Sequence, residues 1–376
     1  MSTPFLLPTT DRRPTSAENR FGINYRDAAQ ALGRPPVAII DAHSHINGSR
    51  ATEIYAEARA AFGITHTFSQ TQLSQVDAVR SVLGDSVSFV AIPDYMSDDP
   101  LTAHTTGFLE ALDTWRDLGA SMVKFWCGPR GRDMGAKVGN PMLMTLESEW
   151  RQKQMERAAE LGYAFMVHIA DPDTWFSTKY ADASFYGTKA SHYEELEKLA
   201  DRYTQPWLLA HMGGWPEDLA FLDGLLERHP NFLLDTSATR WMVRELSKHP
   251  SDELVAFFKR HEGRILFGSD IVTMDAHLTA DPGPRDTGRQ ASSEDQAFDL
   301  YASRYCALRL MFETDYRGAS PIADPDLHMI DPERYTPSDA PPLTGHAMPE
   351  DMLRVLYRNA AENTLMKWYQ RESVAP

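Results

Sequence analysis

The sequence predicts an α/β fold of the (β/α)8 TIM-barrel class. Three observations lead to this prediction: short apolar strands alternate with amphipathic helices after residue 36, eight such units follow one another, and metal-type polar side chains end four of the strands. Strands that are joined by helices pair in parallel. A doubly wound open sheet is the structural rival. The barrel is favoured because a closed ring alone lets strands 1, 5, 6 and 8 aim at one point.

The individual elements follow from hydrophobic periodicity and from the residues that bound each run. Strands are expected near residues 37–41, 64–69, 87–92, 121–126, 164–169, 207–211, 232–235 and 265–269. Helices are expected near 51–62, 72–83, 105–118, 147–161, 191–203, 216–229 and 241–261, the last one broken at Pro250. Four of these helices are followed by a residue suited to a left-handed terminating position, namely Gly63, Gly84, Gly119 and Gly162.

The domain organisation predicted from the sequence is one barrel with additions. Residues 1–36 are rich in polar residues and proline and are expected to form an N-terminal arm, whereas residues 37–376 form a single domain. The segment 275–295 contains Asp281-Pro282-Gly283-Pro284 and predicts a long loop or lid after strand 8. Extra C-terminal helices are expected near 293–314 and 350–369, with a connection rich in proline and aspartate at 318–343.

The composition of the chain argues against several classes of protein and of binding partner. The net charge of −16 over 376 residues argues against a nucleic-acid partner or an anionic membrane surface. Two cysteines, Cys127 and Cys306, give neither a disulfide framework nor a cysteine-type zinc cluster, which suits a reduced cytoplasmic setting. No apolar run approaches the roughly 18 residues of a membrane span, and the N-terminal segment lacks the basic region of a signal peptide.

Four strands end in residues that commonly ligate metals. Strand 1 continues into Asp41-Ala42-His43-Ser44-His45, and side chains two residues apart on a strand lie on the same face. Strand 5 ends at His168, strand 6 at His211, and strand 8 is followed by Asp270. Each residue alone has a structural explanation, but their occurrence together at the carboxyl ends of strands predicts a metal site. Five other histidines lie away from these ends and are expected on the surface: His104, His192, His229, His249 and His261.

These motifs resemble those of the amidohydrolase superfamily, and specifically the amidohydrolase-2 (amidohydrolase-related) family that includes aminocarboxymuconate-semialdehyde decarboxylase. The resemblance extends from residue 37 to about residue 366 and includes Ala210-His211-Met212-Gly213-Gly214, Phe267-Gly268-Ser269-Asp270 and Asn359-Ala360-Ala361-Glu362-Asn363. Many superfamily members carry a β-sandwich beside the barrel. Only 36 residues precede strand 1 here, so no flanking β-sandwich is expected.

The resemblance implies that His43, His45, His168 and Asp270 ligate one divalent metal, with zinc expected first. Three neutral imidazoles and one carboxylate leave a net positive site, which lowers the pKa of bound water. Asp270 can accept the proton of that water. His211 is expected to act as the base or to hold a developing oxyanion. Manganese and iron suit the same ligands.

Lys124 leaves the number of metals open. It ends strand 4, where binuclear members of the superfamily carry a carboxylated lysine. Carboxylation would make Lys124 a bridging anion and His211 a ligand of a second metal. The alternative is an unmodified lysine that neutralises a substrate carboxylate or a buried acid. One metal is favoured.

The expected reaction is metal-dependent hydrolysis of an amide, lactone or ester by metal-activated water. The alternative is non-oxidative decarboxylation of an unsaturated or aromatic carboxylic acid at the same site. Aromatic and cationic residues in the loops after the strands predict a rim for a small organic substrate: Trp126, Arg130, Trp175, Trp215 and Arg240.

The expected partner is a small-molecule substrate. A homodimer is also expected, because the N-terminal arm and residues 318–343 could wrap a neighbouring chain.

Overall fold

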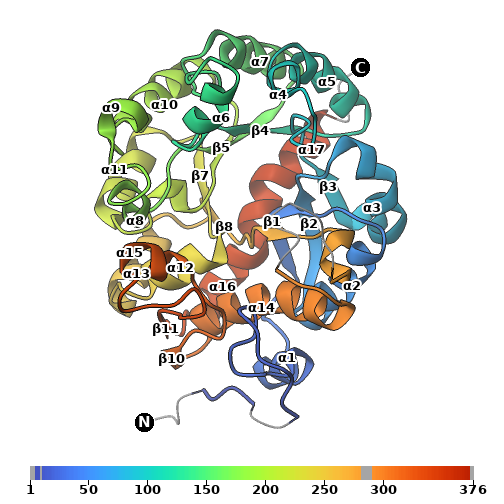
Figure 1. Ribbon diagram of the computed structural model, residues 1–376, viewed down its shortest axis with the longest axis vertical. Helices are drawn as coiled ribbons and strands as arrows, with labels where there is room; N and C mark the ends of the chain where they lie inside the picture. Colours follow the sequence, from blue (N-terminus) through green and yellow to red (C-terminus); the bar gives the residue numbers. More distant parts are fainter. Residues whose placement is uncertain (1–4, 9–10, 281–289, 373–376) are drawn as a thin grey trace. The chain divides into compact units, whose positions relative to one another are not determined.

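The computed structural model describes the chain except residues 1–4, 9–10, 281–289 and 373–376 (Figure 1). The chain divides into two compact units. Unit 1 comprises residues 1–67, 75–87 and 236–360, and unit 2 comprises residues 68–74, 88–235 and 361–376. Each unit is therefore assembled from segments that are distant in the sequence. The predicted loop at Asp281-Pro282-Gly283-Pro284 lies outside the described residues.

Unit 1 combines short parallel strands with helices from both ends of the chain. Its strands are β1 (Ile39–His45), β2 (Ile64–Ser69, whose last two residues belong to unit 2), β8 (Ile265–Leu266) and β9 (Ile271–Val272), with the antiparallel pair β10 (Arg317–Ala319) and β11 (Pro342–Thr344). Its helices are α1 (Tyr25–Leu32), α2 (Arg50–Ala61), α3 (Val76–Leu83), α12 (Thr239–Leu246), α13 (Ser251–Arg260), α14 (Glu294–Glu313), α15 (Asp326–Ile330) and α16 (Glu350–Arg354). A π-helical turn at Val355–Asn359 follows α16.

The core of unit 1 lies around β1 and α14. Residues 39–44 of β1 are buried on both faces, as in a strand covered on both sides. Residues 297–312 of α14 are buried throughout, and α1 and α2 contact this helix (Figure 1). β1 pairs in parallel with β9, with Ser44 opposite Ile271 and His45 opposite Val272. This pairing brings the segment after β8 to the carboxyl end of β1.

Unit 2 contains a parallel sheet in the order β4-β5-β6-β7. These strands are β4 (Met122–Trp126), β5 (Ala164–His168), β6 (Trp207–Leu209) and β7 (Phe232–Asp235), and β3 (Val87–Phe89) precedes them. The helices are α4 (Pro100–His104), α5 (Thr106–Asp117), α6 (Gly131–Lys137), α7 (Glu149–Glu160), α8 (Asp173–Phe176), α9 (Ala183–Tyr186), α10 (Ser191–Arg202), α11 (Leu219–Arg228) and α17 (Lys367–Glu372). Phe165 on β5 packs edge-on against Phe125 and Trp207 of the neighbouring strands, which ties the sheet together.

Most predicted elements are present with shifts of a few residues. Strands 64–69 and 232–235 coincide with β2 and β7, and the break at Pro250 separates α12 from α13. The four glycines predicted after helices all have positive φ angles, between 54° and 89°. The predicted strand 37–41 is displaced: β1 begins at Ile39, after a bend at residues 36–37, and continues to His45. The two histidines therefore lie on the strand itself.

The short elements of unit 1 are absent from the sequence prediction. Residues 16–36 pack into unit 1 through α1, where Tyr25, Ala28 and Ala29 are buried and Asn24 caps the helix by accepting a hydrogen bond from the N–H of Arg26. The connection 318–343 contains α15 and parts of the β10–β11 pair. Elements of three to eight residues are too short for hydrophobic periodicity to mark them. Among the described helices, none combines the length and the apolar character that a membrane span requires.

The expectation that five histidines lie on the surface is wrong for three of them. His104, His229 and His261 are buried, whereas His192 and His249 are half-buried. His104 packs at the end of α4 against the ring of Tyr95, with ring centroids 5.4 Å apart. Sequence alone could not show this burial, because it arises from contacts with side chains of other segments, such as Tyr95 for His104 and Glu197 for His229.

Burial of His104 predicts acid sensitivity. Desolvation, with Arg151 adding to it, lowers the pKa of His104 from 6.5 to about 4. Between these values the unfolded chain binds a proton that the folded chain does not, so the free energy of unfolding should fall as pH decreases through this window. The loss for this residue should reach about 2–3 kcal/mol near pH 4. Urea unfolding measured from pH 7 to pH 4 should show that the free energy of unfolding falls less steeply with decreasing pH in His104→Asn than in the natural protein. Equal slopes for the two proteins would contradict this prediction.

Candidate metal centre

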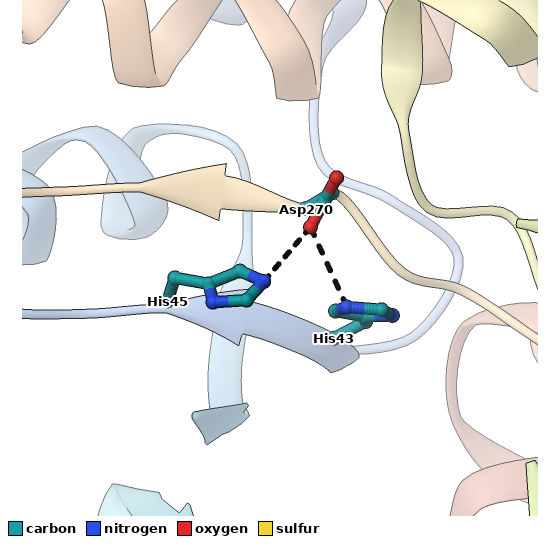
Figure 2. A group of neighbouring side chains, drawn as sticks. All are labelled: His43, His45 and Asp270. Atoms are coloured by element: carbon teal, nitrogen blue, oxygen red, sulfur yellow. Dashed lines mark ion pairs between the residues drawn. The ribbon is translucent and has the colours of Figure 1, made fainter. Parts of the chain in front are cut away.

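The two histidines of β1 converge on one carboxylate oxygen in unit 1. The Oδ1 atom of Asp270 lies 3.4 Å from Nε2 of His43 and 3.1 Å from Nε2 of His45 (Figure 2). The imidazole ring centroids of the two histidines are 5.6 Å apart. His43 is fully buried, while the side chains of His45 and Asp270 are 29% exposed. The three donor atoms therefore form a cluster with one solvent-accessible side.

A tight turn after β8 places Asp270 in this cluster. The backbone N–H groups of Ser269 and Asp270 donate to the carbonyl oxygen of His43, at 3.3 and 2.8 Å. Asp270 has a φ angle of 60°, in the left-handed region that aspartate tolerates better than most residues. The hydroxyl of Thr239 donates to the carbonyl oxygen of Ser269 at 2.9 Å. These bonds fix the backbone of the turn against β1.

Asp41, on β1, connects this strand to the turn through hydrogen bonds. Its carboxylate accepts hydrogen bonds from the N–H of His43 and the N–H of Ser269, both at 3.1 Å. It also accepts from the hydroxyl of Ser269 at 2.5 Å and from that of Tyr305 at 2.8 Å. Burial raises the pKa of Asp41 to about 7, against the opposing effect of these hydrogen bonds. These contacts make Asp41 a structural hydrogen-bond acceptor that joins the turn to the strand.

Ser237 contacts the other side of the His43 ring. Its hydroxyl lies 3.0 Å from Nδ1 of His43. With Nδ1 engaged by Ser237, Nε2 is the ring nitrogen directed at Asp270. Sequence reasoning missed Ser237, since a serine two residues after a strand is common.

The geometry in unit 1 fits a tetrahedral cation. Two nitrogen or oxygen ligands at about 2.0–2.1 Å from zinc lie about 3.3–3.4 Å apart. The two distances to Asp270, 3.1 and 3.4 Å, are close to that separation. Two imidazole nitrogens and one carboxylate oxygen are also a donor set that zinc, manganese and iron accept. His43, His45 and Asp270 could therefore hold one divalent metal.

His168 lies in unit 2 at the end of β5. Its Nε2 is 2.7 Å from Oδ1 of Asp171, and the hydroxyl of Tyr180 donates to Oδ2 of Asp171 at 2.7 Å. Burial alone would raise the pKa of the Asp171 carboxyl, but the neighbouring His168 and Tyr180 hold it below its usual range. Sequence reasoning missed Asp171, because only the folded chain shows that its side chain contacts His168.

His211 and Lys124 also lie in unit 2 and are buried. The His211 ring meets that of His168 edge-on, with centroids 4.7 Å apart. The backbone φ angle of His211 is 60°, in the left-handed region, and the backbone N–H of His211 donates to Oδ1 of Asp235 at 2.9 Å. Lys124 is opposite Met166 in the β4–β5 register. Lys124 is the middle residue of β4 and does not end it, and His211 lies in the turn after β6, two residues beyond its end.

The expected rim residues of unit 2 differ in their surroundings. Trp126 is half-buried and approaches His168 edge-on at 6.3 Å, whereas Arg130 is exposed. Trp175 carries the ammonium group of Lys179 over its ring at 4.0 Å. Trp215 stacks on Tyr193 and lies beneath Lys189. Trp175 and Trp215 thus pack against other side chains of unit 2, and their role in substrate binding stays a prediction.

Arg240 has a structural partner in unit 1. Its guanidinium donates to Glu18, a buried residue of the predicted N-terminal arm that also pairs with Arg304. The Arg240 side chain is 25% exposed. Its role in binding an anionic substrate stays a prediction, and a substitution there would also disturb Glu18.

The comparisons with known proteins give one family match. The family model described as Amidohydrolase matches residues 100–362, which is more than half of the chain. The match includes His168, His211 and Asp270 and begins after the segment with His43 and His45. No curated protein sequence matches the chain significantly.

Several solved structures are similar to this chain. An amidohydrolase from Burkholderia multivorans with bound zinc is 13% identical, with 88% of this chain and 99% of that chain covered and a TM-score of 0.39. Dihydropyrimidinase from Brevibacillus agri is 14% identical, with 83% of each chain covered and a TM-score of 0.39. 5-Carboxyvanillate decarboxylase from Sphingomonas paucimobilis is 10% identical, with 73% of this chain and 98% of that chain covered and a TM-score of 0.37.

The family match and the parallel strands that alternate with helices confirm the predicted fold class, a (β/α)8 barrel. In the described part of the chain, β10 and β11 form a separate antiparallel sheet of only two three-residue strands, and no β-sandwich accompanies the larger sheets there.

Proposed function

Because the chain belongs to the amidohydrolase family, we propose that it is a metal-dependent hydrolase in which water attacks an amide, lactone or ester carbonyl of a small organic substrate. The observation that carries this proposal is the convergence of His43, His45 and Asp270 on one point. The lone pairs of two imidazoles and a carboxylate repel one another when they face the same point. A bound cation, or a proton shared between the groups, removes this repulsion. Its partial exposure leaves access for water and substrate.

The chemistry divides between the cation and the side chains. A divalent cation held by these three residues would polarise the carbonyl and lower the pKa of water. Asp270 can accept a proton from the attacking water through its carboxylate. Ser237 and Asp41 hold the imidazole of His43 and the backbone of the turn in place, so that neither must reorganise during turnover.

Three residues of unit 2 complete the proposal. His168 is proposed as a further ligand, and His211 as the residue that accepts a proton or stabilises the oxyanion of the tetrahedral intermediate. Lys124 is proposed to remain unmodified, so that one metal is bound. An intact mass that includes a carboxylated lysine under bicarbonate would contradict this last assignment.

The test is turnover of zinc-loaded protein on two substrate panels. The proposal predicts hydrolysis of at least one amide, lactone or ester, with water incorporated into the released acid. The second panel contains hydroxybenzoates and muconate-type acids, with carbon dioxide release as the readout. Carbon dioxide release without any hydrolysis would overturn the hydrolase proposal in favour of the decarboxylase alternative.

A further inference from the structure

A buried hydrogen-bonded chain runs from His168 to Tyr180. Asp171 is 3% exposed and lies between them, with Oδ1 at 2.7 Å from Nε2 of His168 and Oδ2 at 2.7 Å from the hydroxyl of Tyr180. Tyr180 is itself buried beside the rings of Trp175 and Phe176. Both carboxylate oxygens therefore have a fixed partner.

The direction of these bonds follows from the chemistry of the groups. An ionised carboxylate can only accept hydrogen bonds, so Nε2 of His168 must carry the proton. A neutral imidazole with its proton on Nε2 has its lone pair on Nδ1. In unit 1, Nε2 of His43 lies 3.4 Å from the Oδ1 atom of Asp270, a longer separation than the 2.7 Å between His168 and Asp171, and Nδ1 of His43 lies 3.0 Å from the hydroxyl of Ser237.

The ring of His168 also has little room to rotate. A methyl group placed on Gly128 would lie 3.0 Å from Cδ2 and 3.1 Å from Nε2 of His168, so the backbone of Gly128 lies directly against that edge of the ring. The rings of Trp126 and His211 flank His168 edge-on. A ring flip would place Cε1 where Nε2 now lies and would break the 2.7 Å bond to Asp171.

We propose that Asp171 is a positioning residue that fixes the tautomer of His168, so that the lone pair with which His168 would ligate a metal is on Nδ1. Tyr180 holds the Asp171 carboxylate in the orientation that this requires. The part of the inference that concerns metal binding rests on the proposed function. The tautomer itself does not, because the contacts that set it lie within unit 2.

The tautomer can be measured directly in metal-free protein. Long-range proton–nitrogen spectra of protein labelled with nitrogen-15 histidine, recorded at pH 8, separate the two neutral forms. His168→Gln identifies the signals of His168. We expect the Nε2-protonated form in the natural protein and in Asp171→Asn, whose amide oxygen can still accept, and a mixture of forms in Asp171→Leu. A His168 protonated on Nδ1, or the same pure form in Asp171→Leu, would overturn the assignment.

Zinc affinity gives the second readout, measured by competition with a chelator. Loss of a partner that orients a ligating histidine typically costs 10–100-fold in metal affinity. Asp171→Leu should lose about that much, Tyr180→Phe less, and Asp171→Asn least. Asp173→Asn is the matched control, since Asp173 is exposed and its carboxylate pairs with Lys189.

The two readouts separate two kinds of failure. Equal zinc affinity in the natural protein and in Asp171→Leu, with thermal unfolding confirming that both are folded, would overturn the positioning role. If the natural protein binds no zinc, the proposed function fails, and the tautomer spectrum still confirms or refutes the assignment of Asp171.

Discussion

Replacing Asp270 with asparagine should weaken zinc binding by more than about 100-fold. Loss of a residue that only hydrogen-bonds to a metal ligand costs up to about that much, and loss of a ligand should cost more. Asp270 supplies the anionic donor atom that both histidines of β1 approach. Asparagine keeps the size of the side chain and tolerates the left-handed backbone of this position. The loss should therefore appear in metal affinity and turnover and leave the free energy of unfolding of the metal-free protein nearly unchanged.

The control for this substitution is Asp252→Asn, in the first turn of α13, where the residue is exposed and far in sequence from the cluster. Zinc affinity is measured by chelator competition, and turnover on whichever ester, lactone or amide proves to be a substrate. Full turnover in Asp270→Asn would be incompatible with the proposed mechanism.

Replacing Asp41 with alanine should give the largest loss of stability among the substitutions considered. Asp41 is fully buried and accepts four hydrogen bonds from three residues, His43, Ser269 and Tyr305. Its removal leaves buried donors without an acceptor, each costing about 1–3 kcal/mol when no relaxation occurs. Allowing for relaxation, we expect the free energy of unfolding to fall by about 3–5 kcal/mol.

Urea unfolding of metal-free protein measures this loss, and Tyr305→Phe is the graded comparison. Removing the Tyr305 hydroxyl deletes one of the four donors to Asp41 and also its contact with the hydroxyl of Tyr55. We expect the free energy of unfolding of Tyr305→Phe to fall by about 1–2 kcal/mol. A loss below 1 kcal/mol in Asp41→Ala would mean that Asp41 does not anchor the turn to β1.

The elements predicted well are those whose burial leaves a periodic pattern. The strands β2 and β7 and the long helices α5, α7 and α10 were located within a few residues. The two-residue strands β8 and β9 could not be delimited from the sequence. They are defined by pairing with other segments, as β9 is by its register with β1.

The candidate site was predictable where ligand types repeat at strand ends. The HxH pattern and the Ser269-Asp270 sequence led to His43, His45 and Asp270, which the structure brings together. The residues that orient them were not predictable in the same way. Ser237, Asp171 and Tyr305 are ordinary residue types, and only the folded chain shows that their side chains contact His43, His168 and Asp41.

The measurement that tests the central claim most directly is the metal content of protein purified without added metal, by inductively coupled plasma mass spectrometry. We expect about one equivalent of a divalent metal, zinc first, in the natural protein and much less in Asp270→Asn. About two equivalents would contradict the single-metal assignment and support a carboxylated Lys124 with His211 as a ligand. No metal in the purified protein, and none taken up on adding zinc, would contradict the proposal of a metal-dependent hydrolase.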